Sequence, residues 1–163
     1  MASSLMWAQG HASSPASVKV TGTGLATNLY CRHHGNERLR LTIEGNHFYA
    51  QPFRLAGIRP EPKVAFLDVL ATRGANTLYL HVINRDPDRV HTVDLDLLGF
   101  ERGPSTIVRH SLVPKPEADW RHHRFDRSKL QEVPAGDFSA GGSMTLEVPA
   151  RSANVFAIGL KSG

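Results

Sequence analysis

Carboxylates and histidines are the residue types in this chain that could carry acid–base or metal chemistry. Hydrolysis by a carboxylate pair needs one acid and one base or nucleophile at a defined separation. Asp86 and Asp88 flank a proline in a sequence typical of a turn. Asp94 and Asp96 alternate with apolar residues, as on the solvated face of a strand. Asp68 alone stands in an apolar run, where we expect a buried carboxylate that accepts hydrogen bonds from the backbone or an arginine. The pattern predicts no catalytic pair.

The nine histidines are spaced in a way that argues against a metal site. The adjacent pairs at 33–34 and 122–123 would point to opposite faces of a strand, so neither pair can easily bind one ion. His81 and His91 could meet across a hairpin, but two ligands without a third make a poor zinc site. Cys31 is the only cysteine, which excludes an intramolecular disulfide and a thiolate zinc cluster. We therefore expect no metal ion and no other cofactor.

One tryptophan is a candidate for binding rather than catalysis. Trp120 lies in the long polar tract 114–142, followed closely by His122 and His123. An indole flanked by hydrogen-bond donors can stack on a sugar ring, which makes these three residues the candidate carbohydrate-binding site. A loop aromatic that anchors a long connection onto its domain would show the same pattern, and the residues alone favour that structural interpretation.

The elements that must position these residues are mostly strands. Leucine and isoleucine alternate with polar residues over 38–45, which predicts a half-buried strand. The run 64–72 is apolar enough to be buried on both faces, which predicts a central strand. It should form a hairpin with 77–84, which should in turn form a second hairpin with 93–97. Similar patterns predict strands at 18–24, 47–53, 105–113, 143–149 and 152–160.

One short helix and one long connection complete the chain. Helical spacing that ends at Gly35 predicts the helix over 25–35, with the glycine as its C-terminal cap. The tract 114–142 is polar and interrupted by prolines and glycines, which predicts an extended connection. Several short strands with turns between them predict an all-β fold, an antiparallel β-sandwich. Periodicity alone leaves jelly-roll and immunoglobulin-like topologies open.

Composition limits the class of protein and its partners. A chain of 163 residues, 40% of them hydrophobic, suits one globular domain. We expect a flexible leader over 1–17, of natural or cloning origin, and a single domain over 18–163. The net charge of +4 is spread among acidic neighbours, so we expect no nucleic-acid partner. We recognise neither a signal peptide nor an apolar run of membrane-spanning length, so we expect a soluble protein with no membrane partner, cytoplasmic rather than exported.

Three segments in a fixed order point to a known family. They are 29-LYCRHHGNERLRLTIEG-45, 67-LDVLATRGANTLYLHVINRDPDRVHTVDLDLLGF-100 and 145-TLEVPARSANVFAIGL-160. This order resembles the C-terminal region of α-L-arabinofuranosidases of glycoside hydrolase family 51. In that family a (β/α)8 barrel carries both catalytic glutamates and a sandwich of jelly-roll type follows it. The resemblance thus implies a jelly-roll sandwich here, and no catalytic residue is carried over because the barrel is not among the matching segments.

The resemblance implies an accessory role for this chain. We expect a non-catalytic domain with a structural or interaction role in arabinan or arabinoxylan degradation, and a catalytic barrel as its partner. The alternative is a carbohydrate-binding module that recognises arabinose-containing polysaccharide through Trp120. Separation from a barrel would expose Leu25, Leu29 and Tyr30, so we also expect a homodimer through that surface.

Overall fold

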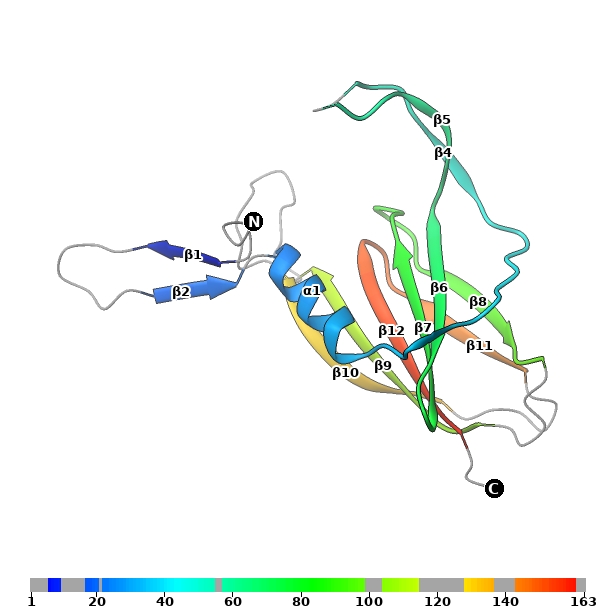
Figure 1. The fold of residues 1–163 in the computed structure, drawn as a ribbon. Coiled ribbons are helices and arrows are strands. Elements are labelled where there is room, and N and C mark those ends of the chain that lie inside the picture. The colour runs from blue at the N-terminus through cyan, green and yellow to red at the C-terminus, as the bar shows by residue number, and fades with distance from the viewer. Residues whose placement is uncertain are drawn as a thin grey trace.

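The computed structural model describes residues 6–9, 17–20, 22–54, 57–98, 104–114, 128–136 and 143–160. Its elements in chain order (Figure 1) are β1 Met6–Gln9, β2 Ser17–Val20, α1 Gly22–Arg32, β3 Glu37–Arg38, β4 Phe48–Gln51, β5 Glu61–Ala65, β6 Leu67–Arg73, β7 Thr77–Asn84, β8 His91–Asp96, β9 Pro104–Pro114, β10 Ser128–Gly136, β11 Ser143–Val148 and β12 Ser152–Leu160. Strands dominate and pair antiparallel, with one short helix, which confirms the all-β prediction. The jelly-roll type stays a prediction.

The largest sheet has six strands in the order β10-β9-β12-β7-β6-β3. β12 lies near its middle, paired with β7 on one side and β9 on the other. Phe156 of β12 stands directly opposite Leu80 of β7, and both are almost fully buried. Such cross-strand apolar pairs fix the register, because a slip by one residue would turn each side chain to the other face.

A smaller sheet of β8 and β11 forms the second layer of the sandwich. Along β11 buried and exposed residues alternate strictly, with Met144, Leu146 and Val148 pointing inward. These three residues join one apolar cluster with residues of the large sheet. The buried members of that core are Leu67, Leu78, Leu80, Val82, Leu95, Ile107, Met144, Leu146, Val148, Phe156 and Ile158.

Helix α1 covers the other face of the large sheet, across β9 and β12 (Figure 1). Tyr30 of the helix contacts His81, which alternates with Leu80 and Val82 and so points away from the core. The helix begins and ends three residues before the predicted 25–35. No helix in the described part of the chain has the length and apolar character that a membrane crossing would need.

Two ribbons extend from the sandwich, each formed by two strands that pair with each other. β4 and β5 project beyond the ends of the neighbouring strands (Figure 1). β1 and β2 form the other ribbon, which draws residues from both sides of the expected boundary at residue 18. The division into a leader and one domain stays a prediction.

The prediction of a central strand buried on both faces at 64–72 was wrong. The run is divided at Phe66 between β5, which belongs to the projecting ribbon, and β6. β6 is next to the edge of its sheet, followed only by the two-residue β3. On its outward face Asp68 and Leu70 are exposed, whereas Thr72 further along the same face is buried beside Gly35 and His81. The apolar side chains of β6 therefore pack against the core on one face of the strand only.

Three other expectations about elements need correction. Within the run 38–45 only Arg38 belongs to a strand, the two-residue β3, and Leu39 and Leu41 instead pack at the margin of the core. The strands at 77–84 and 93–97 do not form a hairpin with each other, because β7 and β8 lie in different sheets. The tract 114–142 contains a long strand, β10, paired with β9 at the edge of the large sheet. The hairpin predicted between 64–72 and 77–84 is confirmed by the pairing of β6 with β7.

Candidate functional site

The candidate carbohydrate-binding residues lie outside the described residues. Trp120, His122 and His123 fall in the interval between β9 and β10, for which the structure gives no description. The sugar-stacking hypothesis therefore stays a prediction that rests on sequence alone.

The carboxylates singled out in the sequence have surface or structural roles. Asp68 is not buried: its side chain is 57% exposed, and its Oδ2 accepts a hydrogen bond from Arg85 Nη2 at 2.7 Å. The expected arginine partner is thus confirmed, while the expected burial was wrong because the face that carries Asp68 is open. Asp94 and Asp96 are exposed, as the alternation predicted, and Asp94 accepts a hydrogen bond from Thr145 Oγ1 at 2.6 Å.

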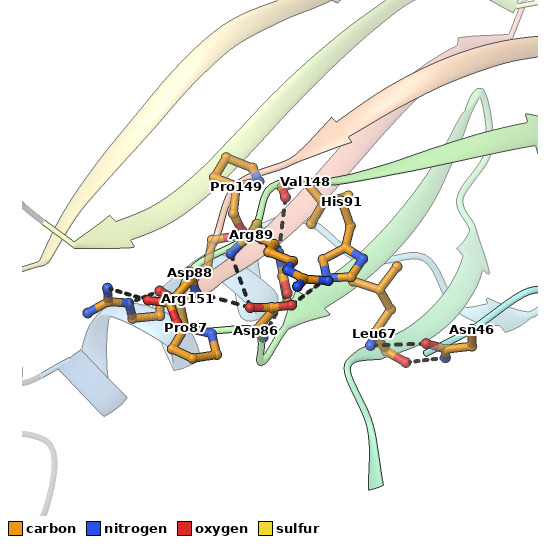
Figure 2. Close-up of polar contacts among 12 residues, drawn as sticks. Asn46, Leu67, Asp86, Pro87, Asp88, Arg89, His91, Val148, Pro149 and Arg151 are labelled. Carbon is orange, nitrogen blue, oxygen red and sulfur yellow. Dashed lines mark hydrogen bonds and ion pairs between the residues drawn. The ribbon is translucent and has the colours of Figure 1, made fainter. Parts of the chain in front are cut away.

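The connections β7–β8 and β11–β12 meet in a network that we call the polar corner, built on Asn84, Asp86, His91 and Arg151. Figure 2 shows the two connections side by side around the Asp86 carboxylate. Asn84 is 2% exposed, and its amide nitrogen donates to the carbonyl oxygens of Arg89, Val148 and Pro149 at 3.0, 3.1 and 2.9 Å. One buried side chain therefore ties both connections together, at the place where the chain passes between the sandwich layers.

Asp86 is the charged centre of the polar corner. Its backbone N–H donates to Asn84 Oδ1 at 2.9 Å, and its carboxylate accepts hydrogen bonds from the N–H groups of Asp88 and Arg89 at 3.0 and 3.1 Å. His91 Nε2 lies 3.0 Å from the other carboxylate oxygen. The bond from the Asp88 N–H, with help from His91 and Arg89, lowers the pKa of Asp86 below its usual range, although burial opposes this effect. The carboxylate is therefore held ionised.

Arg151 closes the polar corner from the β11–β12 connection. Its backbone N–H donates to the Asp86 carbonyl oxygen at 3.0 Å, and its guanidinium Nε donates to the Pro87 carbonyl oxygen. It adopts a φ of 52°, in the left-handed region that side chains other than glycine rarely enter. The turn at 86–88 was predicted from the sequence, but this network was not. The Asn-x-Asp spacing, which favours side-chain bonds to the following N–H groups, was the available signal.

A second cluster lies between α1 and the large sheet, and we call it the helix interface. The rings of His33 and His110 are stacked at 3.7 Å with an interplanar angle of 17°, and those of Tyr30 and His81 lie 5.4 Å apart. His81 Nε2 is 3.4 Å from Thr72 Oγ1. Four aromatic side chains thus fill the contact between helix and sheet.

Burial sets the protonation of the helix interface. It lowers the pKa of His33, and His110 adds to this effect while Glu132 opposes it. Burial, with the neighbouring His34 and His33 charges, also lowers the pKa of His81. The same burial raises the pKa of Tyr30, whose hydroxyl has no partner among the described residues. The helix interface therefore favours neutral rings, in contrast to the ionised centre of the polar corner.

Gly35 allows the chain to leave α1 close to the sheet. Its N–H donates to Thr72 Oγ1 at 3.0 Å. A Cβ at this position would lie 2.0 Å from the carbonyl carbon of Arg73 and 2.4 Å from the nitrogen of Gly74. Among the described residues the left-handed glycines are Gly45 and Gly57. The need for glycine at position 35 therefore comes from close packing and not from the cap expected in the sequence.

The described residues show no cluster of three or more metal-ligating side chains. His81 and His91, which the sequence placed across a hairpin, belong to the helix interface and the polar corner respectively. A shallow groove of about 450 Å³ lies beside β6, lined by Arg38, Leu39, Arg40, Leu41, Ile43 and Val69. Its lining contains neither a carboxylate nor a histidine, so it offers no general acid or base at neutral pH.

The chain is similar to known proteins in its fold but not in its sequence. No family model and no curated protein matches the chain. The GH51 α-L-arabinofuranosidase from Thermotoga petrophila RKU-1 matches with a TM-score of 0.68 at 14% identity, over 86% of this chain and 29% of its own. The α-L-arabinofuranosidase from Thermotoga maritima, in its arabinose complex, gives 0.66 at 14%, over 88% and 30%. A β-porphyranase of glycoside hydrolase family 86 from Bacteroides plebeius gives 0.60 at 15%, over 98% and 22%. The chain therefore has the fold of one part of these enzymes and spans less than a third of their length.

Proposed function

We propose that this chain is a non-catalytic accessory β-sandwich domain that corresponds to the C-terminal domain of an α-L-arabinofuranosidase. It serves a structural or interaction role in arabinan or arabinoxylan degradation, with a catalytic barrel as its partner. The observation that carries the proposal is the one-sided match, in which most of this chain covers only 29% of the Thermotoga petrophila enzyme.

The chemistry of the described residues supports a non-catalytic role. The groups with altered pKa values, among them Asp86, His33 and His81, are engaged in contacts between layers of the fold. The same fold also occurs in a β-porphyranase. Since enzymes named for different substrates share this sandwich, it is better suited to a role common to them than to one substrate's chemistry.

A hydrolysis assay tests the absence of catalysis. The purified chain should release no nitrophenol from 4-nitrophenyl α-L-arabinofuranoside and no arabinose from arabinan or arabinoxylan above the buffer rate. The Thermotoga petrophila arabinofuranosidase is the positive control for the assay. Turnover that scales with the amount of chain and persists through a further purification step would contradict the proposal.

The alternative function is a carbohydrate-binding module that recognises arabinose-containing polysaccharide through Trp120, His122 and His123. Its support is the sequence pattern alone. Calorimetry with arabinan and arabinoxylan tests it, with Trp120→Ala expected to abolish the binding heat. Phe53→Ala removes another aromatic, 68% exposed on the projecting ribbon, and serves as the matched control. Binding that Trp120→Ala leaves unchanged would exclude this site.

A further inference from the structure

The ribbon of β4 and β5 projects from the sandwich and has the properties of a protein-contact element. We define the arm as residues 47–66, of which 47–54 and 57–66 are described. Its strands pair with each other and with no further strand in the described chain. A two-stranded ribbon of this size is marginally stable in water unless another surface covers it.

The arm exposes large apolar side chains along its length. Phe48, Phe53 and Ile58 are 46%, 68% and 60% exposed. The base of the arm is packed by the Tyr49 and Phe66 rings, which lie 4.9 Å apart. Exposed apolar side chains gathered on one projecting element are typical of a protein-contact surface.

The arm is also basic. Arg54, Arg59 and Lys63 are exposed, and the ammonium of Lys63 lies 4.3 Å from the centre of the Phe48 ring. Glu61 is the single carboxylate in the described part of the arm, and its Oε1 accepts a hydrogen bond from the Lys63 N–H at 3.3 Å. A surface that fits the arm should therefore be acidic and flat enough to accept a ribbon.

The outer side of the small sheet has the complementary character. Asp94 and Asp96 of β8 and Glu147 of β11 point away from the core and are exposed, and we call this surface the acidic face. Thr92 and Thr145 share the surface, and neither strand contains a lysine or an arginine. Three exposed carboxylates on this antiparallel sheet thus match three cations on the arm in sign and number.

We propose that the chain forms a homodimer in which the arm of each copy lies on the acidic face of the other. Each copy carries both surfaces, and in this dimer a two-fold axis makes the arm-to-face contact twice and closes the assembly at two chains. The contact buries the apolar side chains of the arm and brings opposite charges together. This interaction goes beyond the accessory function and does not depend on a carbohydrate or a barrel.

A charge-exchange experiment tests the dimer. Sedimentation velocity and light scattering over a concentration series should show the wild-type chain in a monomer–dimer equilibrium that weakens with added salt. Reversal of the arm in R54E/R59E should raise the dimer dissociation constant about tenfold or more, and so should reversal of the acidic face in D94K/D96K. An equal mixture of the two variants should restore the dimer, because each reversed arm then meets a reversed face.

The matched control is R38E/R40E, which reverses two exposed arginines beside the groove and should leave the dissociation constant unchanged. Circular dichroism of each variant verifies that the sandwich is folded. A strictly monomeric wild-type chain at the highest concentration would overturn the proposal. A dimer that survives both reversals would overturn it as well. It would direct attention to the predicted surface of Leu25, Leu29 and Tyr30 on α1, although the expected exposure of Leu29 was wrong, because that side chain is buried against the sheet.

Discussion

The polar corner and the helix interface both bury ionisable side chains between layers of the fold, yet the polar corner stabilises an ionised group while the helix interface favours neutral ones. In the polar corner, two backbone N–H groups and His91 stabilise the ionised Asp86, and its pKa is lowered. At the helix interface burial dominates, and the pKa values of His33 and His81 are lowered toward the neutral ring. Burial alone therefore removes charge, while burial with directed hydrogen bonds retains it.

The two regions should consequently respond to acid in different pH windows. The lowered pKa values of His33 and His81 mean that their contribution to stability is complete above the ordinary value of 6.5 and is lost as the pH falls through the folded-state pKa. The pKa of Asp86 is also lowered, from an ordinary value of 3.8, so its contribution to stability is lost only in stronger acid. The helix interface should therefore weaken first.

The largest effect should come from opening the polar corner with Asn84→Ala. The substitution leaves three carbonyl oxygens and the Asp86 N–H without this buried partner. We expect the free energy of unfolding to fall by about 3 kcal/mol, because buried polar groups that lose their partners keep the desolvation penalty. Urea unfolding at neutral pH measures it. Asn36→Ala at an exposed position is the control and should change stability by less than about 0.5 kcal/mol.

Sequence reasoning predicted strands more reliably than their partners. Alternation correctly marked 143–149 as a strand, because β11 has one buried and one exposed face. The strand predicted at 152–160 is also confirmed, although β12 has no exposed face. It could not show that β7 and β8 lie in different sheets, since strands on both sides of a sandwich alternate alike. The contacts that separate β7 from β8 lie in the polar corner, where the Asn84 side chain donates to carbonyl oxygens 64 and 65 residues further along the chain. Such long-range bonds leave only a weak local signal, here the Asn-x-Asp spacing.

The candidate site was less predictable than the fold for a related reason. The sequence correctly provided an arginine partner for Asp68 but placed that carboxylate in a buried strand. Whether an apolar run is covered on one face or two depends on the layers around it, and these are set by distant segments. The role of Gly35 has the same origin, because the backbone that it approaches belongs to the β6–β7 turn.

The second largest effect should come from the helix interface with Gly35→Ala. The new Cβ would overlap the Arg73 carbonyl group, so α1 must move away from the sheet. We expect a loss of about 2 kcal/mol in the free energy of unfolding from this overpacking. Gly74→Ala is the matched control, because its nearest neighbour would be a tyrosine ring atom at an ordinary 3.5 Å. Equal stability of the two variants would contradict the close contact.

A smaller effect should separate the two regions by pH. The unfolding free energy of the wild-type chain should decrease as the pH falls below 6.5, because the unfolded state takes up protons that the partly buried His33 and the buried His81 resist. The double variant H33Q/H81Q should show a shallower slope in that window, whatever its stability at neutral pH. Urea titrations at several pH values measure the slope. His47→Gln, at an exposed position, is the control, and an unchanged slope in H33Q/H81Q would place the titration elsewhere.

The smallest effect should come from removal of the Asp86 charge while its shape is kept. Asp86→Asn still offers one acceptor oxygen to the N–H groups of Asp88 and Arg89 but loses the negative charge that these groups and His91 Nε2 face. The variant should be less stable than the wild-type chain at neutral pH. The difference should shrink as the pH falls below 3.8 toward the lowered pKa of Asp86, since protonation then neutralises the wild-type carboxylate too. Urea midpoints from neutral to acid pH measure this convergence. A constant difference would mean that Asp86 acts through shape rather than charge, and the contrast with the helix interface would then rest on the histidines alone.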